Sequence, residues 1–425
     1  MNIAIWGNEL IGWTAATAFA EYGNKVHINQ SLEKQESLSE QSDKNPILFN
    51  EPGLLLLVKK QYDQDNLVFG NPEEALHCPV QILALHPDEL DLAQLLIQRL
   101  VKEQHQKIVI INYSTFGLGA TDTLASLIIN KEKQSIAYIP DHLSEGSAYE
   151  NFTQAKTLVV GCDHSEAIIK IKALYKPISR NLDQLLIIKP REAEFMKFAI
   201  NGMLALRLGY VNELANLADH LGIDIETITT GMGSDSRIGK HYLSPGCGFG
   251  GSHFSKSIQN MAELLKTNRN SIILNTLLEE NNKQKLIPFK KLWQHYKTDI
   301  KDKIVAVWGL SFKPNTASIQ NAPSIEIVKT LIAQGCRIQA HDPKAIFNFS
   351  KLFPVNGHVS YYQNAMDALQ DADALIILTE WNEYWSPDYS QMIKTMKQPL
   401  IIDGRNIMDK QFLKDQGFTY YGVGR

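Results

Sequence analysis

Short apolar runs alternate with amphipathic stretches from the N-terminus to about residue 185. Leu10–Tyr22 and Asp88–Glu103 repeat their apolar residues at helical spacing and predict two helices. The apolar runs between such stretches predict strands at Asn2–Trp6, Lys25–Ile28, Gln81–Leu85, Lys107–Asn112, Ile136–Ile139 and Thr157–Gly161. Strands that alternate with helices in this way are typical of a parallel, doubly wound sheet.

The pattern changes after Pro190. Ala193 to Leu221 contains no proline and keeps helical apolar spacing, which predicts one long helix, with further helices at Ser257–Leu265 and Ser271–Leu292. The long helix includes the run Met203-Leu204-Ala205-Leu206, so two of its faces need covering. One domain rarely covers both, and we therefore expect a homodimer through this helix.

Alternation of strands and helices returns after Asp302. Ile3–Gly7 and Val305–Gly309 have closely similar sequences, as expected for the first strands of two related sheets. Strands are predicted at Ile304–Val307, Arg337–Ala340, Ala374–Leu378 and Leu400–Ile402, with a helix at Pro323–Gln334. We expect an α/β fold of two Rossmann-like doubly wound sheets flanking a central long-helix domain, divided as residues 1–188, 189–296 and 297–425.

Composition excludes several classes of function. The formal net charge of -4 gives no global field that would attract nucleic acid or anionic lipid. The first residues enter a strand without a basic segment, and no apolar run reaches the ~18 residues needed to cross a bilayer. The four cysteines lie far apart, which argues against a zinc site or a disulfide framework and fits a reducing cytoplasm. We expect no metal site, although Asp141, His142 and Glu145 are of ligand type.

The turn after the first strand is an incomplete dinucleotide fingerprint. In G-x-G-x-x-G the middle glycine lets a pyrophosphate touch the backbone. Here Gly7 and Gly12 occupy the outer positions, with Ile11 beside the second, but Glu9 occupies the middle one. The second strand ends at Asn29, where a carboxylate usually binds the adenine ribose. NAD binding at this turn is therefore expected to be weak or absent.

Two further segments carry candidate chemistry. Lys197 and Asn201 lie four residues apart and share one helix face, where a cation beside an amide suits stabilisation of an alkoxide or a bound water. Residues 245–256 read PGCGFGGSHFSK and precede a helical pattern. Such a glycine-rich run lets a ligand approach the main chain, and helix-start amides bind anions.

The run 245–256 resembles P-G-F-G-F-G-G-S-C-F-P-K-D, the catalytic loop of the UDP-glucose/GDP-mannose dehydrogenase family. Further ordered matches to this family extend along almost the whole chain. They are Glu51-Pro52-Gly53-Leu54 (E-P-G-L), Ser114-Thr115 (S-T-V-P), residues 140–146 (P-E-F-L-x-E-G), residues 193–201, residues 235–239 (D-x-R-I-G), residues 312–316 (F-K-P-N-T) and residues 403–406 (D-G-R-N).

The resemblance implies a role for each matched residue. The family oxidises C6 of a nucleotide sugar twice, with two NAD, through a thioester on its loop cysteine. By resemblance, the catalytic group comprises His253 at the cysteine position, Lys197, Asn201, Thr115, Asp141 and Lys256. The implied cofactor residues are Gly7, Glu9, Ile11, Gly12, Asn29, Ser114 and Glu145. The implied substrate residues are Tyr242, Gly250, Lys313, Arg405 and Arg237, the last reaching a partner subunit's substrate.

The chain departs from the family mainly at cofactor and oxidation positions. His253 replaces the nucleophilic cysteine, and an imidazole is a poor substitute for a polarisable thiolate. Cys247, six residues earlier, is a candidate substitute nucleophile or a packed loop thiol. The other departures are Glu9, Asn29, Asp141, Ser257, Ser318 and Gln320. By contrast, the residues that the family uses to bind the nucleotide sugar are retained.

Three functional hypotheses follow. The first is a binding or regulatory protein that retains a nucleotide sugar such as UDP-glucose and has lost or altered the NAD-dependent C6 oxidation. The second is an active dehydrogenase with non-standard catalytic residues that yields aldehyde or acid. The third is a structural dimer without a ligand.

Overall fold

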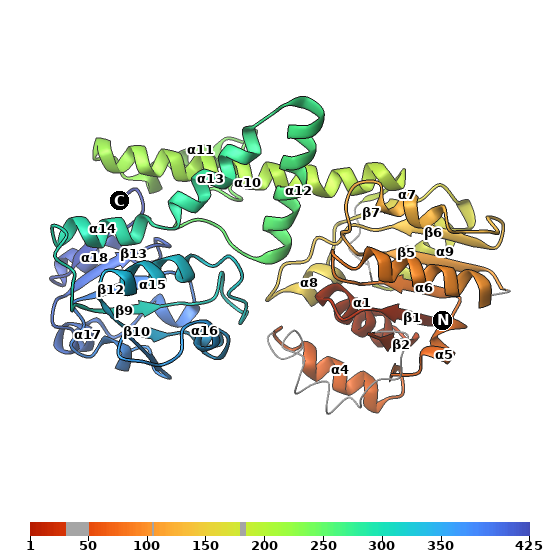
Figure 1. Ribbon diagram of the computed structural model, residues 1–425, viewed down its shortest axis with the longest axis horizontal. Helices are drawn as coiled ribbons and strands as arrows, with labels where there is room; N and C mark the ends of the chain where they lie inside the picture. Colours follow the sequence, from red (N-terminus) through yellow and green to blue (C-terminus); the bar gives the residue numbers. More distant parts are fainter. Residues whose placement is uncertain (31–50, 104–105, 179–183) are drawn as a thin grey trace. The chain divides into compact units, whose positions relative to one another are not determined.

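The computed structural model describes residues 1–30, 51–103, 106–178 and 184–425. The chain divides into two compact units, residues 1–197 and 198–425, and each contains one large sheet (Figure 1). The helix α10 (Pro190–Leu221) begins in the first unit and continues into the second. Among the described residues, no helix is both long and apolar enough to cross a membrane.

The first unit contains an eight-stranded sheet in the order β3-β2-β1-β4-β5-β6-β7-β8. Its strands are β1 (Asn2–Trp6), β2 (Lys25–Asn29), β3 (Leu67–Phe69), β4 (Val80–Leu83), β5 (Ile108–Asn112), β6 (Gln134–Tyr138), β7 (Thr157–Gly161) and β8 (Gln184–Ile188). Neighbouring strands are parallel except β6 and β7, which meet antiparallel at Tyr138 and Gly161. The expected doubly wound sheet is thus confirmed, with one antiparallel junction that the alternation of strands and helices did not reveal.

Helices cover both faces of this sheet. They are α1 (Leu10–Glu21), α4 (Leu54–Asp63), α5 (Pro72–Leu76), α6 (Leu90–Glu103), α7 (Ala120–Ala125), α8 (Ala148–Thr153) and α9 (Ser165–Tyr175). Apolar residues of α1, α4, α8 and α9 form one core, and those of α5, α6 and α7 form the other. Because both faces are covered, strands such as β5 consist of consecutive buried residues.

The second unit contains a six-stranded, fully parallel sheet in the order β11-β10-β9-β12-β13-β14. Its strands are β9 (Ile304–Trp308), β10 (Arg337–His341), β11 (Val359–Tyr362), β12 (Ala374–Ile377), β13 (Leu400–Asp403) and β14 (Thr419–Tyr421). Its sheet-covering helices are α14 (Ile287–His295), α15 (Pro323–Ala333), α16 (Ile346–Leu352), α17 (Tyr389–Thr395) and α18 (Lys410–Asp415), with short 3₁₀ turns η1 (Asp367–Leu369) and η2 (Asn382–Tyr384). This arrangement confirms the predicted second Rossmann-like sheet.

A helical layer precedes this sheet in the second unit. It contains the rest of α10, then α11 (Ile225–Ser234), α12 (Ser252–Arg269) and α13 (Ile273–Gln284). Phe198 and Ala205 of α10 pack on Ile258 and Leu274 in one core. The predicted long helix is confirmed. The prediction of one helix over Ser271–Leu292 is wrong, because α13 ends at Gln284 and α14 begins at Ile287, with proline in its first turn.

Candidate functional site

The turn after β1 retains the close packing of a dinucleotide fingerprint. Gly7 has a φ of 115°, and a Cβ there would lie 2.0 Å from the Ala84 carbonyl oxygen. A Cβ on Gly12 would lie 2.8 Å from the Ala84 side chain. These two glycines therefore let α1 and β4 approach each other. Glu9 is the residue before α1, and its backbone N–H faces the same Ala84 oxygen at 3.4 Å.

The end of β2 differs from the expected ribose contact. Asn29 is fully buried, and neither polar atom of its side chain has a hydrogen-bond partner among the described residues. Gln30, the next residue, is partly exposed. At this strand end Gln30, which the sequence interpretation did not single out, is therefore the residue that reaches the surface.

A buried chain of hydrogen bonds fixes the segment that carries Ser114 and Thr115. A Glu194 carboxylate oxygen accepts from the Thr121 N–H at 2.8 Å, and the Thr121 hydroxyl bonds the Asn112 side-chain amide at 3.2 Å. The Asn112 oxygen accepts from the Ser114 N–H at 2.9 Å, and the Ser114 hydroxyl accepts from the Leu85 N–H at 2.8 Å. The predicted cofactor residue Ser114 thus has its hydroxyl bound to the segment that directly follows β4.

Glu194 and Glu51, which lie in segments that match family motifs, each bind the N-terminal end of a short helix. The second oxygen of Glu194 accepts from the Gly119 N–H at 2.6 Å, at the start of α7. Glu51 accepts from the Gly146 and Ala148 N–H groups, both at 2.6 Å, at the start of α8. Carboxylates satisfy the free N–H groups of a helix start and complement its dipole. Glu51 thereby holds the loop that contains the half-buried Glu145.

An ion pair joins Asp141 to Lys197 beyond the end of β6. The Lys197 side chain is 8% exposed and that of Asp141 is 23% exposed. Thr115 hydrogen-bonds the hydroxyl of Tyr138, whose pKa is raised by burial and by the Asp141 and Glu194 charges. Lys197, Asp141 and Thr115, three of the predicted catalytic residues, therefore lie in one cluster.

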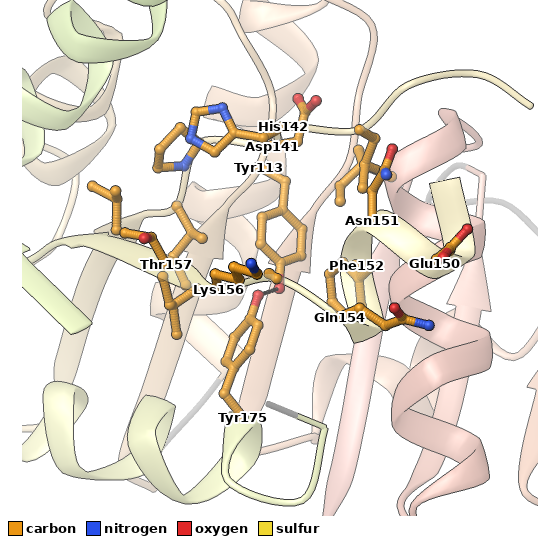
Figure 2. A pocket seen from close by; sticks show the side chains of 17 residues that line it. Tyr113, Asp141, His142, Glu150, Asn151, Phe152, Gln154, Lys156, Thr157 and Tyr175 are labelled. Carbon is orange, nitrogen blue, oxygen red and sulfur yellow. Dashed lines mark hydrogen bonds between the residues drawn. The ribbon is translucent and has the colours of Figure 1, made fainter. Parts of the chain in front are cut away.

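A cavity of about 420 Å³ opens beside this cluster (Figure 2). Its lining includes the predicted site residues Ile11 and Asp141, and the hydroxyls of Tyr113 and Tyr175 are hydrogen-bonded to each other within it. The lining residues are Ile11, Tyr113, Ile139–Leu143, Glu150–Phe152, Gln154–Val159 and Tyr175. Within the described part of the chain, no group of three or more His, Cys, Asp or Glu side chains is placed to hold a metal ion.

The glycine-rich run lies in the second unit, where other backbone and aromatic groups pack against it. A Cβ on Gly250 would lie 2.6 Å from the Asn321 carbonyl oxygen, and one on Gly251 would lie 2.9 Å from the Phe312 ring. Gly251 also has a φ of 88°. Glycine is therefore required at both positions, for close packing at each and for the left-handed conformation at the second.

Amide side chains from α10 and α13 bind this loop. The Asn281 side chain accepts from the Phe249 N–H at 2.9 Å and donates to the Phe249 carbonyl at 3.1 Å. Gly246 donates to the Asn212 side chain at 2.9 Å and accepts from the Gln284 amide at 2.8 Å. The loop backbone is thus hydrogen-bonded at Gly246, where its glycine-rich part begins, and at Phe249 within it.

Arg405 also holds the loop. Its guanidinium donates to the carbonyl oxygens of Leu378 at 2.7 Å, Gly248 at 3.3 Å and Phe312 at 3.3 Å, and it pairs with Glu380 at 3.2 Å. These contacts join the glycine-rich run to the loops after β9 and β12. Arg405, expected from the sequence to bind substrate, therefore positions the surrounding backbone in this structure.

The residue at the family's cysteine position reaches solvent. His253 lies in the first turn of α12, and both His253 and Lys256 are exposed. Cys247 has no exposed surface, and its Sγ lies 3.9 Å from the Leu378 carbonyl oxygen. Burial raises the pKa of the Cys247 thiol, although Arg405 opposes this effect. Cys247 is therefore a packed thiol, not an accessible nucleophile.

The remaining predicted residues are distributed over the second unit. Arg237 has an 87% exposed side chain and pairs with Asp235 at 2.7 Å, a contact that raises the pKa of the guanidinium. Tyr242 has a φ of 59° and is 43% exposed. Lys313 lies 5.6 Å from the centre of the Phe312 ring, and Asn201 is half-buried on α10.

Comparison with known proteins gives consistent matches. Three domain models of the UDP-glucose/GDP-mannose dehydrogenase family match the chain: the NAD binding domain at residues 1–179, the central domain at 191–284 and the UDP binding domain at 306–410. A UDP-glucose 6-dehydrogenase of Pseudomonas aeruginosa is 31% identical, over 100% of this chain and 98% of its own length. One of Bacillus subtilis is 30% identical, over 100% of this chain and 93% of its own length. The solved UDP-glucose dehydrogenase of Pyrobaculum islandicum has a TM-score of 0.85 and 25% identity, covering 100% of this chain and 97% of that one.

Proposed function

Since the chain belongs to the UDP-glucose/GDP-mannose dehydrogenase family, we propose that it binds a nucleotide sugar such as UDP-glucose and has lost or altered the family's C6 oxidation. The family motifs present at the loops of both units support the binding part of this proposal. The second part concerns the residue that would attack the sugar aldehyde.

One observation carries the loss of the oxidation: the chain has no accessible thiol. All four cysteines of the sequence lie in the described part of the structure, and all are free and buried. The exposed position at the start of α12 holds His253 instead. A thioester needs a thiolate as nucleophile and later as leaving group, and an imidazole does not replace it as a hydride-donating adduct.

The retained polar residues support nucleotide-sugar binding. Lys197 is held by Asp141 at the end of β6, and Asn201 follows one turn later on the same helix. In the second unit Lys313 and Arg405 border the glycine-rich loop, and Gly250 keeps its backbone close to Asn321. We assign these residues to the sugar nucleotide, together with Lys256 and Tyr242, and Arg237 to a partner's site.

The residues at the first-strand turn fit NAD poorly. Gly7 and Gly12 retain the turn, but Glu9 places a carboxylate at the start of α1, where a pyrophosphate would need positive potential. Asn29 replaces the acid that would bind a ribose, and Gln320 replaces an arginine that would contact the cofactor. We therefore assign no reaction step to this cofactor.

A second candidate function is an active NAD-dependent UDP-sugar 6-dehydrogenase with non-standard catalytic residues. The ion pair between Asp141 and Lys197, close to the Thr115–Tyr138 hydrogen bond, favours it, because this cluster would still bind a sugar hydroxyl. His253 would then act as a base, and the product would be mainly the aldehyde. The third hypothesis, a structural dimer without ligand, does not explain why this polar cluster is retained.

We further propose a homodimer through α10 and a three-domain organisation close to residues 1–188, 189–296 and 297–425. Five apolar residues of α10 in the second unit remain exposed: Ile200, Met203, Tyr210, Leu217 and Leu221. Their spacing of three, four or seven residues places them on one helix face, as at a helix–helix interface. The free cysteines agree with a cytoplasmic location, which we also propose.

Calorimetric titration with UDP-glucose, UDP-glucuronate and NAD, each alone, tests the proposal. Binding of a UDP-sugar with weak or undetectable NAD binding is the expected result. Low-micromolar NAD binding would favour the active dehydrogenase. Failure of UDP-sugars at millimolar concentration would favour the ligand-free dimer.

A further inference from the structure

His142 differs from the residue that the family pattern has at this position. The segment Pro140-Asp141-His142-Leu143 aligns with the family's P-E-F-L, so an imidazole occupies the position of a phenylalanine. It follows directly on Asp141, whose carboxylate is bound by Lys197. The sequence interpretation considered His142 only as a metal ligand, and the described residues form no such cluster around it.

The position of His142 makes its side chain available to a ligand. The side chain lines the cavity of the first unit, on the segment that follows β6 (Figure 2). Among the described residues, no side chain or backbone group makes a hydrogen bond or an ion pair with the imidazole. A ring with one donor and one acceptor nitrogen therefore borders a space of about 420 Å³.

The charges around the cavity balance. Asp141 and Glu150 contribute carboxylates to the lining, and Lys156 contributes an ammonium. The Lys197 ammonium of α10 pairs with Asp141. Besides His142, the remaining titratable lining groups are the buried hydroxyls of Tyr113 and Tyr175, which bond each other. Because the positive charge does not exceed the negative charge, the cavity suits an uncharged, hydroxyl-bearing group better than a phosphate.

We propose that His142 is a specificity-determining residue that binds the uncharged sugar part of a nucleotide sugar in this cavity through its neutral imidazole. This inference rests on the proposed function and assigns a contact to a residue of this chain that the family lacks. The imidazole hydrogen-bonds a sugar hydroxyl, and the aliphatic and tyrosine side chains of the cavity pack against the ring carbons.

Because His142 can titrate, binding of a sugar beside its imidazole is coupled to the release of protons. His142 is exposed, but desolvation by the groups around it, and next the Lys197 charge, lower the pKa of its imidazole, while Asp141 opposes them. A sugar in the cavity removes more water from the imidazole, which disfavours the charged form further. Binding therefore favours the neutral ring, so it releases protons and weakens as the pH falls through the pKa of His142.

Calorimetry of the full chain with UDP-glucose, in buffers of different ionisation enthalpy at pH 5.5 and 7.5, measures this release. UDP alone lacks the sugar, and because its terminal phosphate titrates at about pH 6, its proton exchange is compared between the wild-type and His142→Gln proteins. His142→Gln has a side chain that forms hydrogen bonds but does not titrate. His142→Phe has an aromatic ring that does neither. His358→Gln, at an exposed histidine of the second unit, is the matched control.

With UDP-glucose we expect proton release only in the wild-type and His358→Gln proteins, whereas with UDP the proton exchange should be the same in all the proteins. His142→Phe should bind about tenfold more weakly at pH 7.5, the effect of one lost hydrogen bond, and without pH dependence. Three results would each overturn the inference: unchanged proton release with UDP-glucose in His142→Gln, a release with UDP that is lost in His142→Gln, or proton uptake with UDP-glucose. Binding of UDP-glucose by none of these proteins would instead refute the proposed function and the inference with it.

Discussion

Cys247 and His253 lie at the two ends of the glycine-rich loop, and only His253 is exposed. The Cys247 thiol is therefore enclosed in the core of the second unit, whereas the His253 imidazole lies at the surface, in the first turn of α12. The loop therefore retains its fold but has no accessible cysteine for the chemistry that the family performs there.

The buried thiols predict slow modification of the native protein. Burial raises the pKa of Cys336 to about 11 and that of Cys78 to about 12, and it also raises the pKa of Cys162 and Cys247. Because thiolates are the reactive form, an aromatic disulfide reagent at pH 7.5 should label no cysteine rapidly until denaturant is added. Fast stoichiometric labelling of Cys247, located by peptide mass spectrometry, would show that the loop thiol is accessible.

The side chain of Asn281 should be essential to the loop. Asn281→Ala leaves the Phe249 N–H and carbonyl without their partners, so the free energy of unfolding should fall by about 2–4 kcal/mol. UDP-glucose affinity should fall as well, because the loop backbone loses its fixed position. Asn268→Ala is the control, since the Asn268 amide, on the exposed side of α12, bonds only the Leu264 carbonyl among the residues that the structure describes. Equal effects of the two substitutions in urea unfolding and calorimetry would contradict this role.

Glu194 should stabilise the first unit more than its neighbour Glu192. Glu194→Ala leaves the Gly119 and Thr121 N–H groups unbound in a buried position, at an expected cost of about 2–4 kcal/mol. Glu192 accepts one hydrogen bond, from the Lys189 N–H, at the exposed start of α10, so Glu192→Ala should cost less than about 1 kcal/mol. Urea unfolding of both variants gives the comparison. The interpretation of the buried hydrogen-bond chain is wrong if the two losses are alike.

The exposed apolar face of α10 should form the dimer interface. Met203 and Tyr210 are each 60% exposed and lie seven residues apart, so a glutamate at both positions should place charge in the interface and yield monomers. Ile129→Glu, at a residue of the first unit that is 78% exposed, is the control and should leave the mass unchanged. Light scattering at micromolar concentration measures the masses, and a monomeric wild-type protein would refute the dimer.

The sequence predicted the sheets and the long helix well, because consecutive apolar strands and helical spacing are local patterns. It did not predict β3, β8, β11 or β14, which are short or only half buried. The antiparallel meeting of β6 and β7 was also missed, since strand direction depends on the chain between them. The break between α13 and α14 was missed although Pro288 marks it.

The candidate site was predicted less completely. Motif spacing indicated Lys197 and Asp141, which form an ion pair, and Thr115 in the same cluster. It did not indicate the three backbone carbonyl partners of Arg405. Such contacts, like those of Glu51 and Glu194 with helix starts, join residues far apart in sequence and leave no periodic signal.

The stoichiometry and rate of NADH formation with UDP-glucose test the central claim most directly. With His253 at the loop position and no accessible thiol, the wild-type protein should form no acid through a thioester, and any slow turnover should stop mainly at the aldehyde after one NADH. His253→Cys alone should not restore family-level rates, because Asp141, Ser257 and the cofactor positions also differ and act together. Rapid wild-type turnover with two NADH per sugar would contradict the account.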